Sequence, residues 1–198
     1  SSNSMIIGKA TSGTGIVSII NATLSGTNAS IGVGEKGVGK LTTSNAASRV
    51  RRLLVGYGTN SFGEAVMGPS SSLEVFQDSV VGGALNGTGR VSFVGSSLLL
   101  TNGTLMIGTN SGYGEVWVTT NATFSSTNNL FRVRNLIIGG DGTAGGALTL
   151  SNRSLQVDAG LVMGGTGGGG CTNTVTVVVS GGTVTVTNTG SQVTINKG

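Results

Sequence analysis

The sequence has few of the residues that carry enzyme chemistry. Among its 198 residues there is no histidine, one cysteine (Cys171) and one proline (Pro69), and charged residues make up only 9%. Without histidine, and with acidic residues that do not pair, general acid–base catalysis has few candidates. We therefore expect no enzyme, no cofactor and no metal. Cys171 has no internal partner, so its candidate role is a cross-link to another chain.

Aromatic residues and long apolar runs are also scarce. Aromatics make up 4% of the chain, and the net charge of +4 comes from 11 basic and 7 acidic residues spread thinly along it. Nucleic-acid binding needs a concentrated basic patch with stacking aromatics, so we expect none. No apolar run approaches the roughly 18 residues of a membrane helix, so we expect no membrane insertion in this segment.

Glycine and small polar residues make up much of the chain instead. There are 37 glycines, and apolar residues reach 37%. The apolar residues are mostly β-branched, which favours strands, and they recur in a pattern, which argues against disorder. Frequent glycines would weaken any helix. The composition therefore predicts an all-β protein.

One short phrase, two or three aliphatic residues followed by glycine, recurs along the whole chain. Its marker glycines are Gly8, Gly34, Gly56, Gly82, Gly108, Gly139 and Gly164, separated by 26, 22, 26, 26, 31 and 25 residues. Periods of about 20–50 residues are typical of solenoids and repeat arrays. We therefore treat residues 1–198 as one repeat-built domain.

Each repeat contains three short strands joined by turns of glycine, asparagine and serine. Three strands in about 26 residues fit one coil of a triangular, parallel β-helix, which we expect to be right-handed. We predict about seven coils, beginning near residues 5, 31, 53, 79, 105, 136 and 161, with a partial closing strand over 191–198 and no capping helix. Inward residues before the markers should form one aliphatic column. An antiparallel sandwich has similar strand spacing, but the recurring order of three different turns favours the solenoid.

Two arginine-bearing segments stand at the same offset before their markers, Gly56 and Gly139. The first contains Arg49, Arg51 and Arg52, and the second contains Arg132 and Arg134 beside Phe131. Strand alternation should point Val50 and Val133 one way and the arginines the other. These arginines and Phe131 are our candidate surface for another copy of this chain or an acidic glycan. Stacking in register would also place Arg52 beside Asp78 as a solvated ion pair.

Other charged residues are expected to have structural roles. Stacking should align Glu64, Arg90 and Glu115 as an outward charge ladder. The stretch 34–40 matches the spacing of a phosphate-binding loop, but Leu41 stands where a serine or threonine should bind Mg²⁺, and no helix follows. Asp141 lies in a glycine-rich stretch similar to calcium-binding repeats, yet calcium needs several oxygen ligands. We interpret both stretches as turns.

Six sequons provide candidate glycosylation sites. They are Asn21, Asn28, Asn86, Asn102, Asn121 and Asn152. In a chain so rich in serine, threonine and asparagine, plain turns or stacked asparagine ladders are the competing interpretation.

The repeats resemble a known family. The stretch from Leu136 to Gly190, with its LIIGG, GGALTLSNRSLQV and SGGTVTV phrases, is similar to the autotransporter-associated β-strand repeats of bacterial surface and secreted proteins. The resemblance implies a right-handed β-helix that is exported and displayed on, or released from, the cell surface. We therefore expect an extracellular structural protein that stacks head to tail with its own copies into a filament or surface matrix. The alternative is an adhesin or passenger stalk that binds glycans or neighbouring surfaces.

Overall fold

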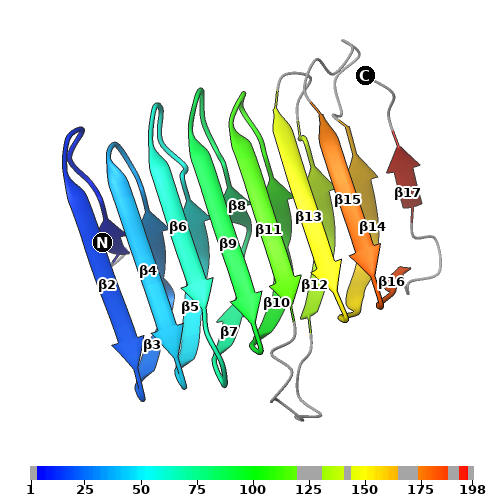
Figure 1. Ribbon diagram of the computed structural model, residues 1–198, viewed down its shortest axis with the longest axis horizontal. Coiled ribbons are helices and arrows are strands. Elements are labelled where there is room, and N and C mark those ends of the chain that lie inside the picture. The colour runs from blue at the N-terminus through cyan, green and yellow to red at the C-terminus, as the bar shows by residue number, and fades with distance from the viewer. Residues whose placement is uncertain (1–3, 120–130, 141–143, 165–173, 187–191, 196–198) are drawn as a thin grey trace.

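The chain folds as a β-solenoid of parallel strands. The computed structural model describes residues 4–119, 131–140, 144–164, 174–186 and 192–195, and none of these residues is helical. The strands form two parallel sheets, one in front of the other, which wind through about six turns (Figure 1). The predicted all-β solenoid is confirmed.

The first sheet contains ten strands and forms the rear layer in Figure 1. Its strands are β1 (Ser4–Ile7), β3 (Thr23–Val33), β5 (Ala47–Val55), β7 (Ser72–Val75), β8 (Ser79–Val81), β10 (Ser97–Ile107), β12 (Phe131–Ile138), β14 (Leu155–Met163), β16 (Val184–Val186) and β17 (Gln192–Ile195). The second sheet forms the front layer. Its seven strands are β2 (Thr14–Ile20), β4 (Val38–Ser44), β6 (Phe62–Met67), β9 (Thr88–Val94), β11 (Tyr113–Thr119), β13 (Gly145–Ser151) and β15 (Val175–Ser180).

We number the coils from the predicted repeat starts. Coils 1 to 6 are residues 5–30, 31–52, 53–78, 79–104, 105–135 and 136–160, and coil 7 begins at residue 161. The ten-strand sheet changes register in the middle of its long strands, between Gly26 and Ser30 in coil 1 and between Leu100 and Thr104 in coil 4. In coil 3 the same place separates β7 from β8. Each coil therefore carries three strand segments, as the repeat pattern predicts.

The predicted aliphatic column exists. Strand pairing joins its members in sequence: Ile7, Val33, Val55, Val81, Ile107, Ile138 and Met163. Val33, Val55, Ile107 and Ile138 have no exposed surface. Because no single coil can bury these side chains, the stability of each coil depends on its neighbours.

The marker glycines turn the chain at one corner. All seven have positive φ angles, between 58° and 75°. At Gly56, a Cβ atom would lie 2.0 Å from the carbonyl oxygen of Thr88 in the next coil. The marker recurs because this corner requires both a left-handed backbone and close contact between coils.

Asparagine occupies a second kind of corner. Asn21, Asn45 and Asn152 have φ angles of 51°, 47° and 51° in the turns that lead out of the seven-strand sheet. The Asn45 Nδ2 atom donates a hydrogen bond to Asn21 Oδ1 at 2.8 Å. Asn86 Nδ2 donates in the same way to Asn60 Oδ1 at 3.0 Å. Short asparagine ladders thus link successive coils on the outside of the solenoid.

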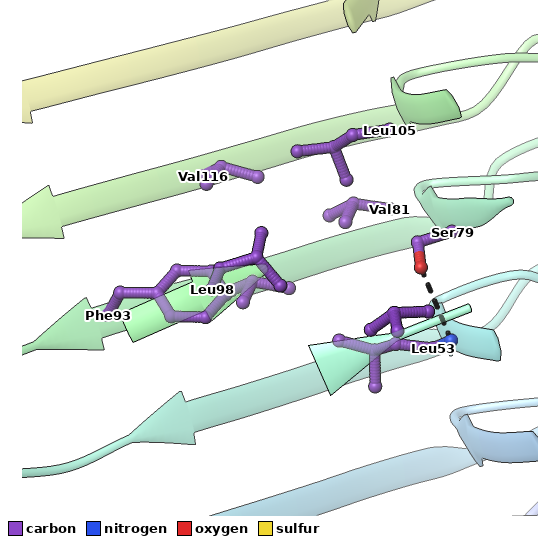
Figure 2. A pocket seen from close by; sticks show the side chains of 9 residues that line it. Leu53, Ser79, Val81, Phe93, Leu98, Leu105 and Val116 are labelled. Carbon is purple, nitrogen blue, oxygen red and sulfur yellow. Dashed lines mark hydrogen bonds between the residues drawn. The ribbon is translucent and has the colours of Figure 1, made fainter. Parts of the chain in front are cut away.

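The interior contains a small apolar cavity lined by residues of coils 3 to 5. Figure 2 shows it between Leu53, Val81, Phe93 and Leu105, with the hydroxyl of Ser79 on its rim. The backbone N–H of Leu53 donates a 3.4 Å hydrogen bond to that hydroxyl. Ser79 stacks in register with Leu105 of coil 5, whose own neighbour in coil 6 is Leu136. A serine among leucines leaves the space unfilled.

Candidate functional site

The first arginine segment forms a groove where the ten-strand sheet bends. Arg51 and Arg52 at the end of coil 2 line it together with Phe76, Gln77 and Asp78 of coil 3 and Asn102 of coil 4. The groove is open to solvent and has a volume of about 420 Å³. We call these six residues the arginine groove.

The groove follows from unequal corner lengths in neighbouring coils. Coil 1 has three residues, 27–29, where coil 2 has only Arg51 between paired positions. Coil 3 also has one more residue at this corner than coil 2, because Val50 pairs with Val75 whereas Leu54 pairs with Val80. The short corner is therefore recessed between longer ones.

Two guanidinium groups converge on one neutral oxygen atom in the groove. Arg51 Nε and Arg52 Nε donate hydrogen bonds to Gln77 Oε1 at 2.7 and 3.2 Å. Two like charges that share a neutral acceptor repel each other, and the amide oxygen does not neutralise them. Gln77 was not anticipated from the sequence, although its position opposite the arginines in the next coil could have indicated it.

The expected ion pair between Arg52 and Asp78 does not form. Ion pairs among the described residues join Lys40 to Glu64, Arg49 to Glu74, Arg90 to Glu115 and Arg132 to Asp158. Asp78 Oδ1 instead accepts a 2.8 Å hydrogen bond from the backbone N–H of Thr104 in coil 4. The Asp78 carboxylate thus bonds to a backbone donor that the sheet holds in place, and Arg52 bonds to Gln77 instead.

The second arginine segment has the same short corner but a different arrangement. Only Arg134 lies between the paired positions Val133 and Asn135, opposite residues 101–103 of coil 4. Arg132 Nε donates to both carboxylate oxygens of Asp158, at 3.0 and 2.8 Å. The Arg134 side chain is exposed. The guanidinium groups of this corner therefore do not converge on one acceptor.

Phe131 is a correction to the predicted surface. Its side chain is only 2% exposed and packs edge-on against Phe93, with ring centroids 5.2 Å apart. It has the same strand parity as Val133, so alternation points both side chains inward and Arg132 outward. The parity argument applied to the arginines also covers Phe131.

The predicted charge ladder lies on the outer face of the seven-strand sheet. Glu64, Arg90 and Glu115 are paired in register, and Lys40 extends the row by one coil. Lys40 contacts Glu64 at 3.2 Å and Arg90 contacts Glu115 at 2.9 Å. Lys40 thus lies inside β4 and forms an ion pair there. This placement fits our interpretation of the stretch 34–40 as a turn, here followed by a strand.

Two half-buried or buried polar side chains were not singled out from the sequence. Burial, with the nearby charge of Glu35, raises the pKa of Tyr57 to about 12. Burial also lowers the pKa of Arg153, whose side chain is 6% exposed and donates to the carbonyl oxygen of Ser96 at 3.4 Å. Neither residue lines the arginine groove.

The candidate glycosylation sites lie on the outside of the described coils. Asn21, Asn86 and Asn152 occupy left-handed turn positions, Asn28 lies in β3, and Asn102 lines the arginine groove. All five are exposed. Asn121, Cys171 and Asp141 lie outside the described residues, and the assignment of each remains a prediction.

The two ends of the described solenoid present apolar strands. β2 and β15 are the outermost strands of the seven-strand sheet. Ile16 and Ile20 of β2 are 69% and 61% exposed, and Val178 and Val179 of β15 are 46% and 41% exposed. In β2, Val17 and Ile19 contact the core but are only partly buried. Ile16 and Ile20 lie on the outer face, in register with Lys40 and Ser44. The side chains that a further coil would cover are the inward ones, such as Ile19 of β2 and Val179, which pairs with the buried Leu150.

Comparison with known proteins adds no identification. No family model, curated protein or solved structure matches this chain. Among the described residues, no helix is both long and apolar enough to span a membrane. The proposals below therefore rest on the solenoid and its surfaces.

Proposed function

We propose that this chain is an extracellular structural rod that stacks head to tail with copies of itself into a filament or surface matrix. The observation that carries the proposal is the match between the two ends of the described solenoid. β2 and β15 belong to the same parallel sheet and point in the same direction (Figure 1). A second copy could therefore continue the sheet with the parallel pairing already used inside the rod.

The apolar side chains at the ends favour the same contact. Inward residues of end coils, such as Ile19 and Val177, pack against the core on one side only. A neighbouring coil would bury their remaining surface, and apolar burial contributes about 25 cal/mol per Å². A contact between different surfaces of identical copies propagates as a fibre instead of closing. Extracellular placement is supported by the family resemblance of the repeats.

Electron microscopy and sedimentation velocity of the purified chain test this function. We expect rods longer than one solenoid, whose six coil-to-coil steps span about 29 Å at about 4.8 Å each. Ile19→Lys places a charge at an inward position of the edge strand, a device that blocks strand addition in natural proteins. Ser18→Lys adds the same charge on the outer face of the same strand and serves as the control.

The outcomes separate assembly from general charge effects. Rods for the unmodified chain and for Ser18→Lys, with dispersed particles for Ile19→Lys, would support end-to-end stacking. A single dispersed species for the unmodified chain over a wide concentration range would reject it. Circular dichroism of the three proteins verifies that Ile19→Lys still folds.

A further inference from the structure

The arginine groove has the donors of an anion site without a matching acid. Each guanidinium group carries five N–H donors in a fixed planar fork. Within the described residues, Arg51 and Arg52 each make one hydrogen bond, from Nε to the same oxygen of Gln77. Because both Nε atoms bond to one atom, they lie within about 6 Å of each other. Four N–H donors of each group remain for a ligand.

The acid in the groove does not neutralise the pair. Asp78 lines the same groove, and its Oδ1 atom accepts the backbone N–H of Thr104 at 2.8 Å. The neighbouring Arg49 is bound by Glu74 at 2.6 Å and does not line the groove. With Arg51, Arg52 and Asp78 as its charged groups, the groove has a formal charge of +1. Planar guanidinium groups match carboxylate and sulfate oxygens in a bidentate arrangement.

The other lining residues suit a sugar. Phe76 is half-buried and lies beside the exposed side chains of Gln77 and Asn102. Binding sites for small ligands combine an apolar surface with a few placed polar groups, and their volumes are about 300–1,000 Å³. The ring can contact the apolar face of a sugar, and the two amides can both donate to and accept from hydroxyl groups. The groove spans coils 2 to 4, so it can follow an extended chain along the rod.

We propose that the arginine groove binds an acidic saccharide, with one carboxylate or sulfate group held between Arg51 and Arg52. Asn102 and Gln77 contact sugar hydroxyls, and Phe76 contacts the ring. The site faces outward from the corner between two strand segments, away from the ends of the rod. Saccharide binding therefore does not depend on end-to-end assembly, and either proposal can fail without the other.

Isothermal titration of the folded chain with defined oligosaccharides tests the site. The probes are a tetragalacturonate, which carries carboxylates, a sulfated carrageenan tetrasaccharide, and neutral maltotetraose. We expect binding of one or both acidic probes and at least tenfold weaker binding of maltotetraose. The stronger of the two acidic probes identifies whether carboxylate or sulfate is preferred. A single-stranded DNA oligonucleotide that binds more tightly than both would overturn the saccharide assignment.

Substitutions distinguish the groove from general positive charge. Arg51→Gln and Arg52→Gln should each weaken binding at least tenfold, because each removes one of the two guanidinium groups that hold the anion. Arg134→Gln removes the same charge from the equivalent corner of coil 5 and should change affinity less than twofold. Arg51→Lys with Arg52→Lys keeps the charge but should still weaken binding several-fold. Asp78→Asn should strengthen it.

Two results would reject the site. One is equal weakening by Arg51→Gln and Arg134→Gln, which would mean attraction by overall charge alone. The other is no heat or chemical-shift change with either acidic probe at millimolar concentration. All substituted side chains are at the surface, and far-ultraviolet circular dichroism verifies that each variant retains the fold.

Discussion

The two arginine corners have the same short bend and the same sequence offset, but their guanidinium groups have different partners. In the arginine groove, two groups converge on the neutral oxygen of Gln77. In coil 5, Arg132 is held by Asp158 and Arg134 extends into solvent. The difference arises in both coils of each pair. Coil 5 has Asn135 where coil 2 has Arg52, and coil 6 has Ala159 where coil 3 has Gln77. A binding surface on a solenoid is therefore made by a pair of coils.

The largest contrast should appear between the phenylalanines beside the two corners. Phe131→Ala removes a side chain that is 2% exposed and packed against Phe93, so it should lower the free energy of unfolding by about 3–5 kcal/mol. Phe76→Ala, from the half-buried groove, should cost about 1 kcal/mol. Urea unfolding followed by circular dichroism measures both. Equal losses would contradict the assignment of Phe131 to the core.

The corner residue of coil 4 allows a second comparison. A Cβ atom on Gly103 would lie 2.3 Å from the Gln77 carbonyl carbon, so Gly103→Ala should force the backbone of the groove apart. We expect a loss of about 2–3 kcal/mol and weaker saccharide binding. Coil 6 already carries Ala159 at its corner, and Ala159→Gly should cost less than about 1 kcal/mol. Thermal unfolding of the two variants, which should differ in midpoint, provides the test.

The apolar cavity in the interior allows a stabilising substitution. Ser79→Val places a methyl group toward the space between Val81, Phe93 and Leu105 and removes a buried hydroxyl from an apolar rim (Figure 2). Filling such space commonly stabilises by about 1 kcal/mol. The variant should unfold at higher urea concentration while its saccharide affinity stays within twofold. A destabilised variant would mean that the hydrogen bond from Leu53 matters more than the void.

The smallest effects should come from the exposed ion pairs. Glu74→Gln removes the partner of Arg49, and Asp158→Asn removes the partner of Arg132. Exposed pairs contribute about 0.2–1 kcal/mol each. We expect Asp158→Asn to have the larger effect, because Asp158 also accepts a 2.9 Å hydrogen bond from Gln156. Salt screens such pairs, so the loss of unfolding free energy caused by each substitution should shrink when unfolding is repeated in 1 M NaCl, where the Debye length is about 3 Å.

Much of the candidate surface could be located from the sequence, but its chemistry could not. The equal offsets of Arg51 and Arg134 from their markers indicated corresponding corners, and strand pairing places both at short corners. The predicted ion pair between Arg52 and Asp78 was wrong. Asp78 accepts the N–H of Thr104 instead, and which of the two donors lies closer depends on the corner lengths of three coils. Side-chain parity contained the information needed for Phe131, because Phe131 and Val133 share one face of the strand.

The amino-acid sequence by itself determined the coil. Marker glycines supply the left-handed corner, alternating β-branched residues supply the strands, and the spacing of the markers stacks their aliphatic side chains in one column. Only the tertiary structure decided which polar side chains meet, because those contacts join residues about 25 positions apart whose alignment shifts by one or two residues at each bend. The repeat pattern therefore predicts the rod, whereas the depth of the groove and the partners of its arginines come from how unequal corners lie against one another.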